Sequence, residues 1–551
     1  MPEAAQRGQV KKARMWPAAI WLPLAAVATL VVYKDLPHTP FFLDDYLHLH
    51  LISKFKQPFE PFYTDIFMGA FFRPAITIFW TLDHAWHGLN ASGYYVSNIG
   101  YLLLSLAALY AVMHNLTGSH VLSGLTTLLF TLSPVTGVGV EWLSNRFDLI
   151  GTLFFLVSTL LFLRYARFRR AADWGLSLFF AIVAFFCKEI TIVLPVTLPL
   201  CAAFMFLYRA PQRFDAELVR RLFSFTTPYF TAAAAFIIWR YLVINSFGGY
   251  VGETKEPLTL VYFLFLWRSL GEYFWLARSF FIVAPLALVS ILLLAKPNFY
   301  GRNKLFLFGL AFAVITASPL AMILKFRAVM SYMTPRFFFL PNIGALIALA
   351  ALYDPRGGRA RRVVAAVLIA AVAVFMGLNN YILVHKWSRD KTRMAAKMDA
   401  MVAAFEVGLP QQAASPSAIV YSCLPGLDVA LDSAVKLRHP DFESRFFFLH
   451  CQGPTQTVAA KSLYLQNRRL LNFPASFARN PCEYDDLIYG VVDTEPKAVL
   501  DQLRAGVPEM VMDLDREGNI ILLDRAQLAK MIKTRFGIDI DETPPEAARH
   551  G

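Results

Sequence analysis

The chain has 551 residues, of which 57% are hydrophobic, 15% aromatic and only 17% charged. This composition is too apolar for a soluble protein of that length and is typical of a protein that crosses a membrane many times. The formal net charge of +13 does not indicate nucleic-acid binding, because the basic residues gather in short segments between apolar runs. That distribution follows the positive-inside bias of membrane proteins.

The first apolar run, residues 17–33, carries no charge and follows the basic residues Arg7, Lys11, Lys12 and Arg14. No small-residue cleavage site follows it, so we expect a retained helix whose N-terminal end faces the cytoplasm. Residues 35–93 then form a long polar loop on the opposite side of the membrane.

Ten further apolar runs predict about eleven spans in total. They cover residues 94–114, 119–138, 147–165, 174–187, 189–208, 226–246, 273–295, 304–324, 336–353 and 362–384. The predicted cytoplasmic loops are basic, as the positive-inside bias requires. An odd number of spans places everything after residue 385 on the side opposite the N-terminus.

The composition changes after residue 385. Residues 386–551 are charged and punctuated by Pro and Gly, which predicts a soluble extracytoplasmic domain of α/β or mainly β structure beyond a membrane domain of residues 1–385. Short apolar runs at 418–421, 446–449 and 487–492 predict strands, and residues 509–524 predict a hairpin. This tail contains Cys423, Cys451 and Cys482. Two of them could form a disulfide, and the sequence leaves the pairing open.

Asp44 and Asp45 follow the aromatic and apolar residues 40–43, directly beyond the first predicted span. Adjacent carboxylates at a membrane edge are unfavourable unless something uses them, so both are candidate functional residues. An Asp that caps the helix containing Leu47 and Leu51 would produce the same pattern. The residue pattern alone leaves both interpretations open.

Three cations, Lys325, Arg327 and Arg336, lie in a predicted outer loop, where the positive-inside bias disfavours them. They indicate an anionic ligand such as a phosphate, which Arg binds through its planar fork. The alternative is that they reach toward lipid head groups. Lys188 and Glu189 form a second charged pair at the predicted outer face, which could be a simple ion pair.

The sequence contains no Walker loop, dinucleotide fingerprint, HExxH or CxxC motif. It therefore gives no support for nucleotide-driven transport or for a zinc site. The spacing of His48, His50, His84 and His87 matches no metal motif. We interpret these histidines as polar residues of interfacial helices.

An ordered set of short motifs resembles the GT-C superfamily of membrane glycosyltransferases, which take a sugar from a polyprenyl-phosphate carrier. Within it the chain is similar to protein O-mannosyltransferase-like and aminoarabinose-transferase-like enzymes and to the tetratricopeptide-bearing O-mannosyltransferases, although it lacks the tetratricopeptide tail. The motifs span roughly residues 35–345 and comprise Asp44-Asp45, Phe72-Arg73-Pro74, residues 86–90, residues 94–98, Pro134, residues 142–149, Lys188-Glu189 and residues 336–341. Relatives often carry His-Pro-x-His where this chain has Ser133-Pro134-Val135-Thr136.

The resemblance implies an inverting displacement at the periplasmic face of a bacterial inner membrane. Asp44 would act as general base with help from Asp45, and Arg336, supported by Arg327 and Lys325, would bind the donor phosphate. The motif residues expected to support this site are Arg73, Arg146, Asp148, Lys188 and Glu189.

The partners implied by the resemblance are membrane lipid, a lipid-linked sugar donor and an acceptor that is a lipid, a polysaccharide or a protein. No cofactor is expected. Adjacent acids can hold a divalent metal, but the most similar members of the superfamily do not require one.

Two other classes of function fit a chain of this kind. A transporter or flippase of a lipid-linked saccharide would also carry charges in its spans, together with inverted repeats and broken helices, and the sequence shows no internal symmetry. A non-enzymatic membrane assembly protein would need neither acid.

Overall fold

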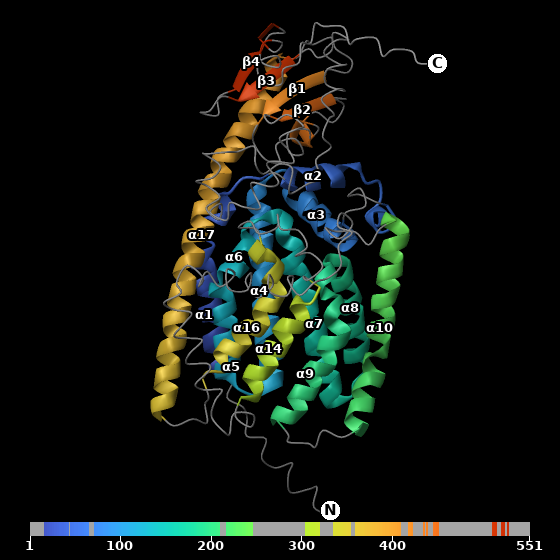
Figure 1. Cartoon of the computed structure of the whole chain (residues 1–551), viewed down its shortest axis with the longest axis vertical. Coiled ribbons are helices and arrows are strands. Elements are labelled where there is room, and N and C mark those ends of the chain that lie inside the picture. The colour runs from blue at the N-terminus through green and yellow to red at the C-terminus, as the bar shows by residue number, and fades with distance from the viewer. Residues whose placement is uncertain are drawn as a thin grey trace, which may run out of the picture.

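The computed structural model describes residues 16–42, 44–64, 71–209, 216–245, 303–319, 334–353 and 359–408, together with short segments of the tail between residues 417 and 530. These residues form an elongated bundle of helices with a small sheet beyond one end (Figure 1). Several predicted features lie outside the described residues: the span 273–295, the strand 487–492, Lys325, Arg327 and the three tail cysteines.

Most of the bundle consists of helices that match the predicted apolar runs. They are α1 (Trp16–Val32), α4 (Ala91–Thr117), α5 (His120–Leu132), α6 (Pro134–Glu141), α7 (Arg146–Phe168), α8 (Ala171–Cys187), α9 (Leu194–Arg209), α10 (Ala216–Ile244), α14 (Lys304–Ala317), α16 (Phe339–Ala350) and α17 (Arg359–Gly408).

Six helices in the described part of the chain are long and apolar enough to cross a membrane. The pair α5 and α6, bent by 57°, would make a seventh span, and α8, α14 and α16 are shorter apolar helices. The chain is therefore a multi-pass α-helical membrane protein, and the total of about eleven spans stays a prediction.

The predicted outer loop supplies α2 (Asp44–Lys54) and α3 (Pro74–His87). Both lie across the end of the bundle that is nearer the sheet, whereas α1 begins at the opposite end (Figure 1). Short 3-10 helices complete the connections: η2 (Leu36–His38), η3 (Glu60–Phe62), η4 (Leu143–Asn145), η5 (Glu189–Val193) and η9 (Thr334–Phe338). Cys187 and Cys201 are buried free thiols in the bundle.

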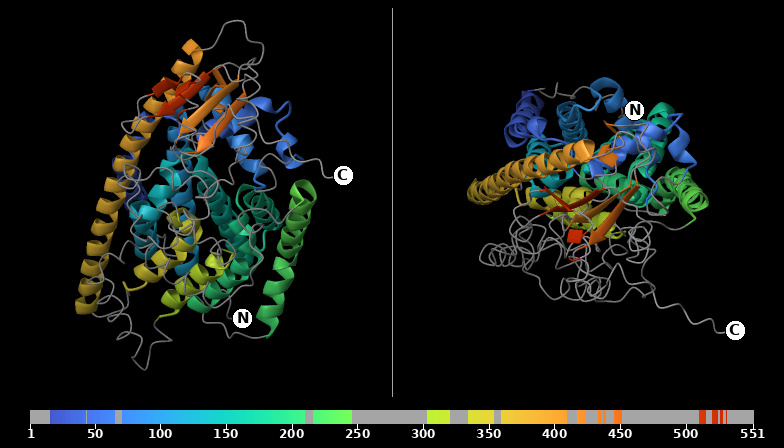
Figure 2. Two further views of the ribbon diagram at one scale, coloured as in Figure 1. Left: turned by 45° about the horizontal axis from the view of Figure 1, so that its top comes forward. Right: turned by 90° about the horizontal axis from the view of Figure 1, so that it is seen from above.

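The helix α17 is 50 residues long. It runs along one side of the bundle and continues past α2 to the sheet (Figure 2). The predicted division at residue 385 therefore falls inside a continuous helix, which ends only at Gly408. The composition changes within this helix, and the backbone does not break there.

The tail sheet has four strands in the order β2-β1-β3-β4. Their bounds are β1 (Ser417–Ser422), β2 (Arg445–His450), β3 (Met510–Leu514) and β4 (Ile520–Leu523). β1 pairs in parallel with both β2 and β3, whereas β3 and β4 are antiparallel. The strands predicted at 418–421 and 446–449 and the hairpin predicted within 509–524 are confirmed. The fold class of the whole tail domain stays a prediction.

The helices α14 and α16 cross at two glycines. A Cβ atom on Gly309 would lie 2.6 Å from both the Ala348 nitrogen and the Gly344 oxygen, and a Cβ atom on Gly344 would meet the Ala313 nitrogen. Small residues allow two backbones in a membrane to approach this closely. The crossing fixes the position of α16, which directly follows η9 and its Arg336.

We expect Gly309→Ala and Gly344→Ala each to lower the melting temperature in detergent. The added methyl group must push two backbones apart, and such overpacking costs about 1–3 kcal/mol. Gly175→Ala in α8 is the matched control, because a Cβ atom there meets nothing within 4 Å and Ala favours a helix over Gly. Equal melting temperatures for all three variants would contradict this account of the crossing.

Candidate active site

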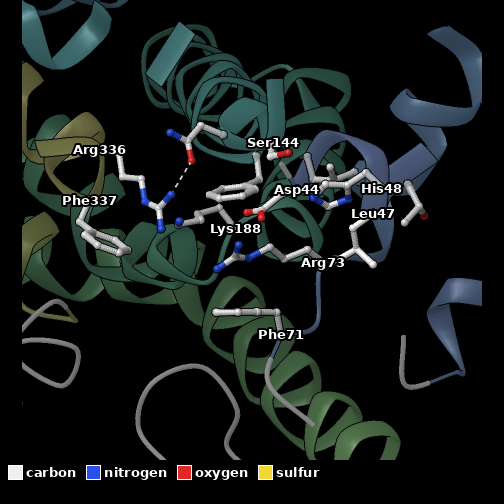
Figure 3. A pocket seen from close by; sticks show the side chains of 13 residues that line it. Asp44, Leu47, His48, Phe71, Arg73, Ser144, Lys188, Arg336 and Phe337 are labelled. Atoms are coloured by element: carbon white, nitrogen blue, oxygen red, sulfur yellow. Dashed lines mark hydrogen bonds between the residues drawn. The ribbon is translucent and has the colours of Figure 1, made fainter. Parts of the chain in front are cut away.

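A pocket of about 110 Å³ lies at the α2 and α3 end of the bundle. It receives side chains from α2, the start of α3, η4, the start of α7, the residue before η5, and η9 (Figure 3). Its lining residues are Asp44, Leu47, His48, Phe71, Arg73, Ile76, Thr77, Ser144, Asn145, Phe147, Lys188, Arg336 and Phe337. Among these described residues, the pocket therefore combines one carboxylate with three cations.

The two adjacent acids have different surroundings. Asp44 lines the pocket, whereas Asp45 is fully buried. Asp45 Oδ2 accepts a hydrogen bond from the Phe42 nitrogen at 2.9 Å, and Oδ1 accepts from the nitrogen and the hydroxyl of Ser144 at 2.9 and 2.5 Å. Burial raises the pKa of Asp45, an effect opposed by the positive charge of Lys391 and by these hydrogen bonds. Asp45 therefore stabilises the start of α2 through Phe42 and connects it to η4 through Ser144.

Arg73, which directly precedes α3, forms an ion pair with Glu189. Its Nε donates to the two carboxylate oxygens of Glu189 at 3.1 and 3.0 Å. Oε1 of Glu189 also lies 3.4 Å from Nη1 of Arg240. Glu189 does not line the pocket, so this ion pair presents a cation to the cavity and keeps its acid outside.

Lys188 repeats this arrangement. Its Nζ lies 3.2 Å from Oδ2 of Asp148, and both side chains are buried. The centre of the Phe147 ring lies 4.1 Å from Lys188 Nζ and also 4.1 Å from Arg73 Cζ. An aromatic face attracts cations at this range. The ring therefore helps to hold two like charges on the same cavity.

Arg336 enters the pocket from η9. Its Nη1 donates to the amide oxygen of Asn145 at 3.0 Å, the contact dashed in Figure 3. Its Cζ lies 5.1 and 5.0 Å from the ring centres of Trp142 and Phe337. Asn145 is a neutral partner, so this hydrogen bond orients the guanidinium without neutralising it.

Arg146 does not line the pocket. It is completely buried, and its Nη1 lies 2.7 Å from Asp83 Oδ2. Its Nη2 also donates to the Tyr94 carbonyl at 3.2 Å, and its Cζ lies 4.5 Å from the Trp80 ring centre. This residue therefore joins α7 to α3 and α4 in the core.

His48 lies in the pocket, one helical turn after Asp44. Its ring stacks on Trp80, with 5.0 Å between the ring centres. Burial and the positive charges of Arg146 and Arg73 lower the pKa of His48 to about 3. The lowered pKa favours the neutral imidazole, so the described pocket lining offers two possible proton acceptors, the carboxylate of Asp44 and the ring of His48.

The sequence pattern did not indicate that His48 lines a cavity. The one available signal is its spacing of four residues from Asp44, because residues separated by four share a helix face. No three His, Cys, Asp or Glu side chains gather as a metal site within the described ranges. The expected independence from metal stays a prediction.

Comparison with protein-family models finds no match, and no curated protein sequence matches the chain. Among solved structures, the chain is similar to the oligosaccharyltransferase of Archaeoglobus fulgidus tethered to an acceptor peptide, with a TM-score of 0.44, 12% identity, and coverage of 81% of this chain and 66% of that one. The same enzyme in complex with Zn and sulfate gives a TM-score of 0.41 and 11% identity, again over 81% and 66%.

A third structure is the archaeal oligosaccharyltransferase AglB from A. fulgidus in complex with an inhibitory peptide and a dolichol-phosphate. Its TM-score is 0.41 and its identity 14%, over 84% of this chain and 68% of that one. The chain thus spans about two thirds of the length of these structures. At these values the similarity is distant.

We expect Arg146→Met to destabilise the protein strongly, because it leaves the Asp83 carboxylate buried without its cation. Breaking a buried pair in this way costs about 3–5 kcal/mol. Arg438→Met is the control, since the side chains of the Arg438–Asp399 pair are 39% and 55% exposed and an exposed pair contributes about 0–1 kcal/mol. Unfolding in detergent would report both changes. Similar losses for the two variants would show that the Arg146 pair has no special structural role.

Proposed function

We propose that this protein is a GT-C type membrane glycosyltransferase that moves a sugar from a polyprenyl-phosphate carrier to an acceptor. One observation carries the proposal: a pocket at the end of a bundle of membrane helices combines the carboxylate of Asp44 with the cations Arg73, Lys188 and Arg336. The ordered motifs of the sequence support the same reaction.

The reaction needs two kinds of group. An acceptor hydroxyl gives its proton to the Asp44 carboxylate while its oxygen bonds to the anomeric carbon of the sugar. The bond between that carbon and the phosphate oxygen breaks, and the lipid phosphate leaves with the bonding electrons. Cations placed at the departing phosphate stabilise the charge that grows there. Attack from the face opposite the phosphate inverts the anomeric centre, and the chemistry requires no cofactor.

The position of the pocket favours a lipid-linked donor. Its phosphate can reach the cations at the end of the bundle while its hydrocarbon chain stays among apolar helices. Arg167, Arg169 and Arg170 lie at the far end of α7, which begins beside the pocket at Arg146. Under the positive-inside bias that far end is cytoplasmic. In a bacterial inner membrane the pocket and the tail domain would then face the periplasm.

One observation favours a second function, the transport of a lipid-linked saccharide. The 57° bend between α5 and α6 is the kind of broken helix on which transporters build midplane sites. A transporter would move such a lipid across a vesicle membrane without cleaving its sugar, so an assay that detects both outcomes separates the two functions.

The central test is transfer of labelled sugar from a panel of polyprenyl-phosphate sugars by the purified protein. We expect Asp44→Asn to cut turnover by about 100-fold or more, the usual contribution of a positioned base. Its melting temperature and donor binding should stay near wild type, because Asn keeps the size of the side chain. Asp35→Asn, which changes an acid paired with His385 outside the pocket lining, is the control. Near-normal transfer by Asp44→Asn would rule out Asp44 as the base.

We expect Arg336→Lys to raise the donor KM although it keeps the charge. Lys loses the planar fork, and one charged hydrogen bond is worth on the order of 1.5–3 kcal/mol, about 10-fold to 150-fold in binding. Arg164→Lys, at a cation outside the pocket lining, should leave the KM unchanged. Donor kinetics that stay normal in both Arg336→Lys and Arg336→Ala would show that Arg336 binds no donor.

A further inference from the structure

A buried lysine on α17 contacts the elements that hold Asp44 in place. Lys391 is 1% exposed. Its Nζ donates to Oε2 of Glu141 at 2.6 Å and also to the Glu141 carbonyl oxygen. Glu141 is 2% exposed and is the last residue of α6, two positions before η4 begins. Lys391 therefore fixes the chain where it enters η4.

The Lys391 ammonium group also stabilises the charged form of a second buried acid, Asp45. Its Nζ lies 5.8 Å from the ring centre of Phe42, whose backbone nitrogen donates to Asp45. The positive charge of Lys391 is also the largest influence that offsets the burial of the Asp45 carboxylate. Two buried carboxylates in one region repel each other, and a nearby cation offsets that cost. Lys391 supplies that cation for Glu141 and Asp45.

Asp45 connects this charge cluster to the pocket. It directly follows Asp44, and its carboxylate accepts two hydrogen bonds from Ser144 of η4. Ser144 itself lines the pocket. The direction in which Asp44 points therefore depends on the contact between the start of α2 and η4, and the Asp45 carboxyl group makes that contact.

Other residues of α17 contact the segment between α1 and α2. Asn380 donates to the hydroxyl of Tyr33 at 3.3 Å, and Ser388 shares a hydrogen bond of 2.6 Å with Thr39. With Lys391 these residues fall on one face of the helix at spacings of eight and three residues. They fasten α17 along the segment that leads from α1 into α2.

We propose that Lys391 is a positioning residue for Asp44. By compensating Glu141 and Asp45, it holds the start of α2 against η4 so that the Asp44 carboxylate stays in the pocket. The role of Asp44 in this inference rests on the proposed function, whereas its position can be measured independently of that function.

The kinetic test compares Lys391→Met with wild type in the sugar-transfer assay. We expect kcat to fall by about 10-fold or more, since a small misplacement of a reacting group has effects of this size. The donor KM should change by less than about 2-fold, because the cations of the pocket keep their partners. Lys386→Met, on an exposed face of the same helix, should match wild type.

A double variant separates charge compensation from simple packing. Lys391→Met combined with Glu141→Gln removes one cation and one acid, so no uncompensated Glu141 charge remains beside Asp45, which keeps its hydrogen bonds to Phe42 and Ser144. We expect this double variant to fold and to regain most of the lost kcat. If it stays as slow as Lys391→Met although its melting temperature recovers, charge compensation does not account for the lost kcat and the inference is overturned.

A second measurement does not depend on enzyme activity. Asp44→Cys places a thiol in the pocket, and mass spectrometry gives its alkylation rate by a water-soluble maleimide. We expect Lys391→Met to change that rate several-fold, and the double variant to restore it. An unchanged rate overturns the inference, whatever the kinetics show. If Lys391→Met changes that rate but the wild-type protein, which keeps Asp44, transfers no sugar from any donor, the inference is supported and the proposed function is refuted.

Discussion

Charges at the pocket end of this bundle are buried, and the fold depends on the partners that surround them. An isolated buried charge costs several kcal/mol. A buried cation and its acid must therefore stay together, and this holds the two elements that carry them in place. The pair Lys188–Asp148 joins the residue between α8 and η5 to α7, and the pair Lys391–Glu141 joins α17 to α6. Both pairs connect segments far apart in the sequence. The same interactions that assemble the helices therefore also set the geometry of the pocket.

The helices could largely be predicted from the sequence, because a long apolar run in a membrane protein has few alternatives to a helix. The two acids show where such reasoning stops. The sequence leaves open whether Asp44 and Asp45 begin a helix or serve a functional site. In the structure Asp45 accepts a hydrogen bond from Phe42 at the start of α2, whereas Asp44 lines the pocket. The contact that ties Asp45 to η4 comes from Ser144, 99 positions away in the chain. A local pattern contains no such information.

Lys391 could not be recognised for a related reason. It lies among the charged residues 386–393, a pattern typical of a solvated helix face. Its burial results from the packing of α17 against α6, a contact between residues about 250 positions apart. The predicted division at residue 385 also assigned it to the tail. Composition marks where a chain leaves the membrane, but it does not mark where the contacts of a helix end.

Because α17 is one continuous helix, the face that contacts the bundle and the face that contacts the tail are set at a fixed angle about the helix axis. Lys391 contacts the bundle, and eight residues later Asp399 meets Arg438 of the tail. Each residue of a helix turns the next by about 100°. Inserting a single residue between these positions would rotate the two contact faces by that angle, and the tail and the bundle could not both keep their contacts. Length variation in this part of the helix is therefore restricted to insertions that complete whole turns, unlike the variation that a flexible linker tolerates.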